Sequence, residues 1–344
     1  MDGWWRSFYL LSHLTHMTSH AQVISIGIDV SQAKLDVCLL GTASVVERRT
    51  IGNDQSGIAS LIALLSRASV APSVPCILES TGDLHLLAAL LLSQAGYHAI
   101  VINPLITKCH QQSSVRGAKN DRIDAERLAN IALMEKHLIP FRDTVTSIGQ
   151  KKIIGLLRNV SEVHAQLTKV YRQFQKTSAI LSLPHGQIKS IEDSIKSTAQ
   201  TIKTLQQMIT ASAPQQAVAL AEETPGLSLM QITIILTALS EKTFQNRDQL
   251  VAFFGLDVRV RQSGTWRGKE SLSKRGDSYC RKILFQIGWS LMRNNSTYKT
   301  YFEHHYKELG KHYTAAILAT SRKFLRFLFS TLYQPSPQLA SLSA

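Results

Sequence analysis

The chain has 344 residues, of which 38 are Lys or Arg and 24 are Asp or Glu, so its formal net charge is +14. A hydrophobic content of 44% excludes a mainly disordered chain, and the length favours two or three domains. The longest apolar runs fall short of the roughly 20 residues of a transmembrane helix. The four cysteines stand far apart, so their spacing indicates neither a disulfide framework nor a zinc module. We therefore expect a folded cytoplasmic protein that attracts polyanions, of which nucleic acid fits better than a membrane.

Residues 1–22 read as an N-terminal extension. They carry an apolar patch but lack the basic start and the small-residue cleavage site of a secretory signal. Met17 offers an internal start just before the first expected strand. Residues 1–16 are therefore either a dispensable extension or part of the working chain, and the sequence leaves both open.

Residues 23–144 have the pattern of an α/β domain. Apolar and β-branched runs predict strands, and apolar positions at helical spacing predict helices between them. The expected strands are Val23–Val30, Leu35–Leu40, Val45–Thr50, Val74–Leu78 and His98–Ile102, and the expected helices are Ser56–Ala68 and Leu84–Ala95. Three strands in succession, followed by strands that alternate with helices, predict a mixed sheet.

Residues 145–213 change to a helical period. We expect one helix over Val145–Leu181, a turn at Ser182–Gly186 and a second helix to about Ile209. Apolar residues in the first helix recur at the 3.5-residue spacing of a coiled coil, at Leu156, Val160, Val163, Leu167, Val170 and Phe174. This antiparallel helical hairpin is either an intramolecular pair or a dimerisation arm.

Residues 214–332 are predicted to form a mainly α-helical domain, with a flexible Pro- and Ser-rich tail at 333–344. Within it, Asp257–Lys282 has eight basic residues against three acidic ones, which favours a surface that contacts phosphates. The residues expected to bind nucleic acid are Arg259, Arg261, Arg267, Lys269, Lys274 and Arg275. Arginines around Ser263-Gly264 would activate the serine as a nucleophile. A plain surface turn is the alternative, and Ser271 and Ser273 are competing nucleophiles.

Four acidic residues stand where a ligand is expected. Asp29 lies near the end of the first strand and Glu79 ends another, and such strand ends commonly bind ligands. Asp121 and Asp124 are three residues apart at the head of a helix and share one face. Converging carboxylates stay ionised around divalent cations, so we expect Mg²⁺, or Mn²⁺, and phosphodiester chemistry. Ordinary first-turn carboxylates are the alternative for the helical pair.

Taken in order, several segments resemble the DEDD insertion-sequence transposases, a family that includes the pilin-gene invertase Piv. The resemblance runs from about Val23 to Leu332. Its segments are Gly27–Ser31, Lys34–Val37, Leu78–Gly82, Val101–Pro104, Lys119–Ala125, Pro225–Gly226, Phe253–Leu256 and Ser263–Gly264.

The resemblance implies an RNase H-like, RuvC-like N-terminal domain in which the four carboxylates bind Mg²⁺. It also implies a C-terminal domain in which Ser263 is the nucleophile, and a dimer or tetramer that acts on DNA at the element ends and the target. A structured guide RNA, used by several members, would suit the basic segment Lys151–Lys176. The expected function is a DNA recombinase or transposase of an insertion sequence. Rival functions are a pilin-type invertase, a junction-resolving nuclease that uses metal-activated water, and a non-catalytic DNA-binding protein.

Overall fold

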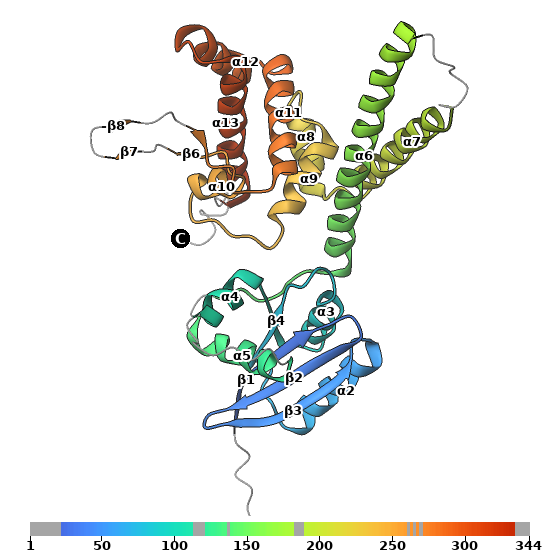
Figure 1. Cartoon of the computed structure of the whole chain (residues 1–344). Coiled ribbons are helices and arrows are strands. Elements are labelled where there is room, and N and C mark those ends of the chain that lie inside the picture. The colour runs from blue at the N-terminus through green and yellow to red at the C-terminus, as the bar shows by residue number, and fades with distance from the viewer. Residues whose placement is uncertain are drawn as a thin grey trace, which may run out of the picture. The chain divides into compact units, whose positions relative to one another are not determined.

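The computed structural model describes residues 22–112, 121–135, 138–181, 189–259, 262–263, 266–267 and 271–333. The predicted N-terminal extension up to residue 21 and the predicted tail from residue 334 lie outside these residues. The chain divides after Thr144 into two compact units, which are described separately below (Figure 1). Of the helices that the structure describes, none combines the length and the hydropathy needed to cross a bilayer.

The first unit is built on a five-stranded sheet with the strand order β3-β2-β1-β4-β5. The first three strands pair antiparallel in succession, whereas β4 pairs parallel to both β1 and β5. The predicted mixed sheet is therefore confirmed. The strands are β1 (Val23–Val30), β2 (Lys34–Gly41), β3 (Val45–Gly52), β4 (Pro75–Glu79) and β5 (His98–Ile102).

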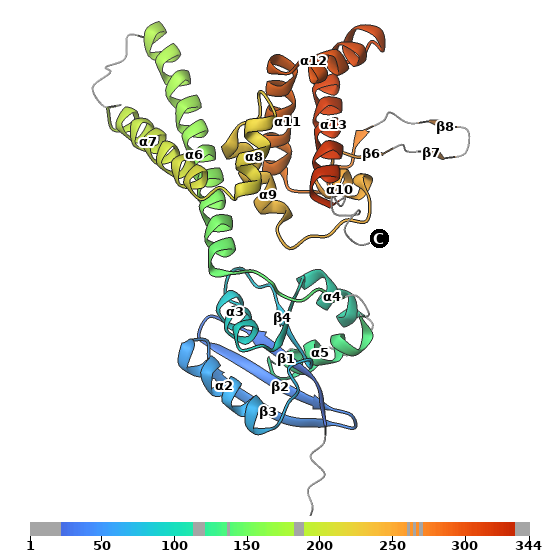
Figure 2. The ribbon, with the colours of Figure 1, turned by 180° about the vertical axis from the view of Figure 1, so that it is seen from behind.

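Helices cover both faces of this sheet. One face packs against α2 (Gln55–Arg67) and α3 (Leu86–Gln94), and alternate side chains of β1, β2 and β4 form the core between them. The opposite face packs against α5 (Asp121–Met134), through a smaller core that includes Ile77 and Leu128. Both views show α2 and α3 on one side of the sheet, with α5 and the preceding α4 (Pro104–Gln112) on the other (Figure 1, Figure 2).

The second unit begins with a helical hairpin. Helix α6 (Val145–Leu181) spans the residues predicted for it, and α7 is Lys189–Ala211. Gln150 donates a hydrogen bond to the Ser212 carbonyl at 2.5 Å, His164 shares one with Thr198 at 2.9 Å, and Tyr171 donates to Glu192. The partners move toward the start of α7 as the chain advances along α6, so the two helices are antiparallel.

The apolar repeat of α6 is divided between two environments. Val160 packs against the core that α7 shares with the helices that follow. By contrast, Leu156, Val163 and Val170 expose 53%, 49% and 57% of their surface. The hairpin therefore covers one row of the repeat and leaves the other row in solvent, so a coiled coil with a further helix stays a prediction.

Most of the remaining helices pack around one core with the first half of α6 and the second half of α7. A smaller core lies between α12 and α13. A two-stranded ribbon of β6 (Val258–Arg259) and β9 (Ser271–Leu272) leaves this helical body, and the short pair β7 (Gln262–Ser263) and β8 (Trp266–Arg267) lies beyond it (Figure 1). The helices are α8 (Gln215–Glu223), α9 (Leu229–Leu239), α10 (Arg247–Phe253), α11 (Ser278–Asn294), α12 (Ser296–Glu303), the π-helix η2 (His304–Glu308) and α13 (Tyr313–Tyr333).

Candidate functional site

Asp29 lies on the face of the sheet that α5 covers. Successive side chains of a strand point to opposite faces, and Ile26 and Ile28 of β1 belong to the core under α2 and α3. On the other face, Ser25 donates a hydrogen bond to the Ala129 carbonyl of α5 at 2.5 Å. Asp29 is four residues after Ser25 in the same strand and therefore points to the same face, so its half-buried side chain is on the α5 side.

Gly27 sets the position of α5 over β1. A Cβ at this residue would stand 1.9 Å from the carbonyl oxygen of Ala125 and 2.4 Å from the backbone nitrogen of Ala129, so the helix touches the strand backbone directly. Ser25 meets Ala129, and Gly27 meets Ala125, four residues earlier in the helix. The helix and the strand therefore run in opposite directions, and the first turn of α5 reaches the level of Asp29.

Glu79 is the neighbour of Asp29 across the parallel pair. Ile28 of β1 pairs with Leu78 of β4, and Asp29 and Glu79 are the next residues on each strand. Residues in register on adjacent strands share a face, and Ile77, two residues before Glu79, packs in the core under α5. The two carboxylates that the sequence placed at strand ends therefore lie side by side at one edge of the sheet.

The helical pair begins at this same edge. Asp121 is the first residue of α5, and its side chain lies outside the described residues. Asp124 is half-buried and forms an ion pair with Arg127 on the next turn, with 2.7 Å between nitrogen and oxygen. The structure thus brings Asp29, Glu79 and the first turn of α5 to one place, which we call the acidic edge.

Asp36 is a further carboxylate beside this edge that sequence reasoning did not assign. It is the antiparallel partner of Asp29 on β2 and only 6% exposed. Lys34 forms an ion pair with it at 2.9 Å, and the Thr50 hydroxyl donates a hydrogen bond to it. Its signal in the sequence is one acidic residue inside the otherwise buried apolar run of the strand Lys34–Gly41.

Asn53 joins the loops that follow the two acidic strands. Its side-chain amide donates to the carbonyl of Ser31 at 2.9 Å, after β1, and to that of Leu84 at 3.1 Å, after β4. Its backbone N–H donates to the Ala33 carbonyl at 3.1 Å. The three bonds hold the ends of β1 and β4 together, and therefore the spacing of Asp29 and Glu79.

The chemistry of the acidic edge suits a hard divalent cation. Carboxylate oxygens are the ligands that Mg²⁺ and Mn²⁺ prefer. Among the side chains that the structure describes, no three His, Cys, Asp or Glu residues are close enough to form a metal site. Asp124 faces Arg127, so it would have to exchange this partner to become a ligand. The donor set fits the cation, and the metal stays a prediction.

Ser263 lies on the short β7–β8 pair, away from the helical body. Its backbone pairs with Trp266, and Gln262 pairs with Arg267. The side chains of Ser263, Arg259 and Arg267, and the whole of Arg261 and Lys269, lie outside the described residues. Of the predicted nucleic-acid contacts, Lys274 and Arg275 are described, and both are exposed.

The segment from β6 to β9, which carries Ser263 and is here called the serine ribbon, leaves the helical body through a closely packed base. Gly255 has a φ of +66°, and a Cβ there would stand 2.7 Å from the backbone nitrogen of Arg275. A Cβ at Gly276 would stand 2.2 Å from the Phe253 carbonyl oxygen. Ser273, one of the competing nucleophiles, donates its hydroxyl hydrogen bond to Asp257. These close contacts fix the two points from which the ribbon leaves the body.

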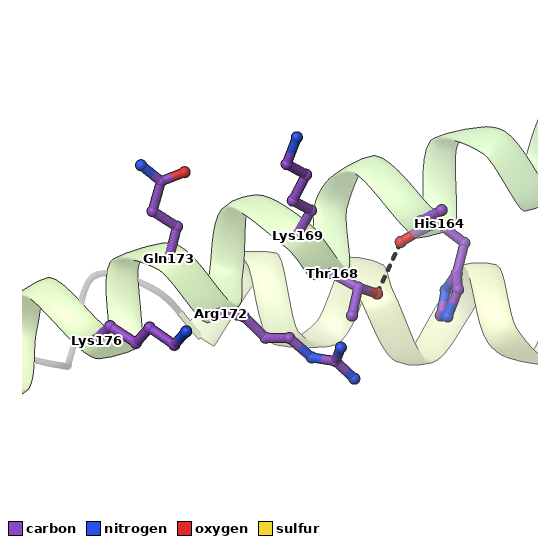
Figure 3. A pocket seen from close by; sticks show the side chains of 7 residues that line it. His164, Thr168, Lys169, Arg172, Gln173 and Lys176 are labelled. Atoms are coloured by element: carbon purple, nitrogen blue, oxygen red, sulfur yellow. Dashed lines mark hydrogen bonds between the residues drawn. The ribbon is translucent and has the colours of Figure 1, made fainter.

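A basic pocket of about 520 Å³ lies along α6. Its charged side chains are Lys169, Arg172 and Lys176, all exposed and spaced at about one turn. In Figure 3, Lys169 projects to one side of α6, whereas Arg172 and Thr168 project to the other, where α7 passes behind. We call Lys169, Arg172 and Lys176 the basic row of α6. The row lies within the basic segment Lys151–Lys176, and its positive charge suits a phosphate backbone.

Two family models match the chain. The first, described as a DEDD transposase of the IS110 type, covers residues 26–183, and the second, described as a transposase of the IS116/IS110/IS902 family, covers residues 218–303. No curated protein matches the chain. The first match contains Asp29, Glu79, Asp121 and Asp124, and the second contains Ser263. The chain therefore belongs to the IS110-type DEDD transposases.

Proposed function

We propose that this protein cuts and rejoins DNA at the ends of an insertion sequence, with the acidic edge and Ser263 as its two catalytic parts. The observation that carries the proposal is the position of Asp29 and Glu79, each one residue beyond the paired Ile28 and Leu78, beside the first turn of α5. The sheet order β3-β2-β1-β4-β5 supports an RNase H-like first unit, because three antiparallel strands followed by two parallel ones are typical of that fold.

In the proposed step, the Ser263 hydroxyl oxygen forms a bond to the phosphorus of the scissile phosphodiester. The bond between that phosphorus and one deoxyribose oxygen breaks, the serine proton goes to a carboxylate base, and the leaving oxygen takes up a proton. Attack by the hydroxyl of a second strand reverses these changes and frees the serine. Arginines and lysines of the segment Asp257–Lys282 hold the strand through its phosphates.

The role of the acidic edge is to supply negative oxygen ligands close to the reacting phosphate. Bound Mg²⁺ or Mn²⁺ would offset the negative charge that develops on the attacking and leaving oxygens. The residues that would bind the cation are Asp29, Glu79, Asp121 and Asp124. Asp36 and Asn53 act as positioning residues, because they hold β2 and the two loops against the residues that carry this charge. The serine and the acidic edge would come from different subunits of a dimer or tetramer.

The test is a denaturation-resistant adduct between the protein and labelled element-end DNA. We expect the wild-type chain to form it with Mg²⁺ and co-expressed RNA, and Ser263→Ala to form none while it still binds DNA. The adduct is measured by denaturing gel electrophoresis and its site by peptide mass spectrometry.

Ser271→Ala and Ser273→Ala test the two competing nucleophiles, since each removes one nearby hydroxyl. Loss of the adduct in one of these variants, with retention in Ser263→Ala, would move the nucleophile to that residue. DNA that is cut without any adduct in the wild type would instead favour the junction-resolving nuclease that uses activated water. Inversion of DNA flanked by the recognised ends, in place of insertion, would favour the pilin-type invertase.

We further propose that the basic row of α6 contacts a nucleic-acid backbone, which a structured guide RNA would provide. Changing Lys169, Arg172 and Lys176 to Gln should weaken RNA binding and reduce the slope of log K against log salt by about 2 to 3, since each phosphate contact contributes about 0.7 to 0.9. The measurement is a salt series by fluorescence anisotropy.

A matched control removes the same charge from the partner helix. Lys189, Lys196 and Lys203 are exposed on α7 at a spacing of seven residues, which is about two turns, and their change to Gln should leave the slope nearly unchanged. An equal loss in both triple variants would mean that net charge, rather than the α6 row, determines binding.

A further inference from the structure

A second hollow of the helical unit lies where the serine ribbon joins the body. This cavity of about 210 Å³, here called the His305 pocket, is lined by residues from β6, β9, η2, α13 and one loop. Ser271 and Leu272 come from β9, His305 comes from η2, and Leu318 and Arg322 come from α13, while Lys311 closes it from the loop between η2 and α13. It is therefore distinct from the acidic edge and from the basic row of α6.

The polar side chains of the His305 pocket are donors. Arg322, Lys311 and His305 all line it, and no acidic side chain is among its described lining residues. Burial lowers the pKa of His305, and the nearby His304, Arg322 and Lys311 lower it further. Cationic groups gathered around one hollow repel each other, and an anion in the hollow relieves that repulsion.

The backbone brings these groups together by an irregular turn. At the end of the π-helix η2, the N–H of Leu309 donates a hydrogen bond to the His304 carbonyl. The N–H of Lys311 donates one to the His305 carbonyl, and both bonds are 3.0 Å long. Gly310 between them has a φ of +59°. The Tyr301 ring meets the His305 ring edge-on with centroids 4.6 Å apart. Such π-helical turns are uncommon and are frequent at functional sites.

The His305 pocket also lies within reach of Ser263. The ribbon leaves the body at Arg259, which pairs with Ser271 of the pocket. Ser263 is four positions after Arg259 in the sequence, so the extended chain between them spans at most about 14 Å. One strand of DNA places a phosphate about every 3.4 Å along its axis, so this reach covers about four nucleotides.

We propose that the His305 pocket binds one phosphodiester group of the DNA strand close to the phosphate that Ser263 attacks. The inference rests on the proposed function, because it takes DNA as the substrate. Arg322, Lys311 and the protonated imidazole of His305 donate to the phosphate oxygens, with the Ser271 hydroxyl at the rim. The pocket thereby sets the register of the strand relative to the serine ribbon.

The first measurement uses inorganic phosphate as the probe on the full-length chain. The imidazole resonance of His305, identified by its loss in His305→Gln, should move as phosphate is added, and its pKa should rise. Lys311→Gln should need at least about tenfold more phosphate for the same shift, since a charged donor is lost. Lys311 is exposed, and its side chain can change without loss of the backbone bond to His305.

The second measurement is the affinity for duplex DNA over a salt series. Lys311→Gln should lower the slope of log K against log salt by about 0.9, whereas Lys299→Gln, which removes the same charge from an exposed site on α12, should not. Arg322 also donates to the Leu256 carbonyl at 3.4 Å, so Lys311 is the cleaner position.

Each other outcome overturns the proposal. If the His305 resonance does not move as phosphate is added, the pocket is not a phosphate site. A response to phosphate with an unchanged DNA slope in Lys311→Gln means that the pocket takes free phosphate, and a loss confined to RNA binding means that RNA is the ligand. A wild-type chain that binds no DNA contradicts the proposed function itself, whereas intact DNA binding by Lys311→Gln contradicts the pocket.

Discussion

Changing Asp29 to Asn is expected to slow DNA cleavage and joining by at least about a thousandfold, equivalent to about 4 kcal/mol of transition-state stabilisation. The amide keeps the size of the side chain but loses the negative charge that a divalent cation or a general base requires. The neighbouring Asp36 is held by Lys34 and Thr50, so it should not replace the lost carboxylate. DNA affinity should stay within about twofold, because the phosphates are held mainly by the basic residues.

Asp54→Asn is the matched control. Asp54 caps the start of α2 by accepting a hydrogen bond from the Gly57 N–H at 2.8 Å, a bond that lowers the pKa of its carboxyl. Asn caps a helix about as well as Asp, so this variant should keep both fold and activity. Single-turnover cleavage of labelled DNA measures both variants. An Asp29→Asn protein that is as active as the control would remove the acidic edge from the mechanism.

Changing Gly27 to Ala should destabilise the first unit by more than about 3 kcal/mol, although it adds a single methyl group. The new Cβ would overlap the Ala125 carbonyl and the Ala129 nitrogen, which are backbone atoms that cannot rotate away. Either α5 moves off the sheet or the strand shifts, and both changes separate Asp29 from the first turn of α5. Activity should fall with stability.

Thermal unfolding by circular dichroism gives the size of this effect, and hydrogen exchange read by mass spectrometry gives its place. Exchange should quicken in α5 and β1 and stay unchanged in α6. Gly155→Ala, in the interior of α6 with nothing within 4 Å of the new Cβ, should be neutral or slightly stabilising. Equal stability of Gly27→Ala and the wild type would show that the close approach of α5 is not required.

The regular elements could be predicted from the sequence because their patterns are local. The five strands lie within two residues of their predicted bounds, and α6 spans Val145–Leu181 as expected. The helix expected from Leu84 begins instead at Leu86, because the preceding residues form turns. In these turns the N–H of Leu84 donates to the Thr81 carbonyl and the N–H of Leu86 donates to the Asp83 carbonyl. Such turns depend on the loop that Asn53 holds, which no local pattern reveals.

The acidic edge was predictable in part. Charges at the ends of apolar strands marked Asp29 and Glu79, and their adjacency follows once the strand order is known. Asp36 was missed because it lies inside its strand and not at the strand end, and its pairing with Asp29 is a property of the sheet. The His305 pocket was out of reach for a similar reason, since its residues are brought together by a π-helical turn and a distant ribbon.

The direct seating of α5 on β1 also has a consequence for the order of folding. The hydrogen bond from Ser25 to Ala129 joins residues 104 positions apart, so the contact closes nearly the whole first unit into a loop. Contacts of this separation form late, after local helices and hairpins. Ribosomes add about 5–20 residues per second, so several seconds pass between the synthesis of β1 and the synthesis of α5, which covers one face of β1. A growing chain therefore carries Asp29 and Glu79 well before it can assemble the acidic edge.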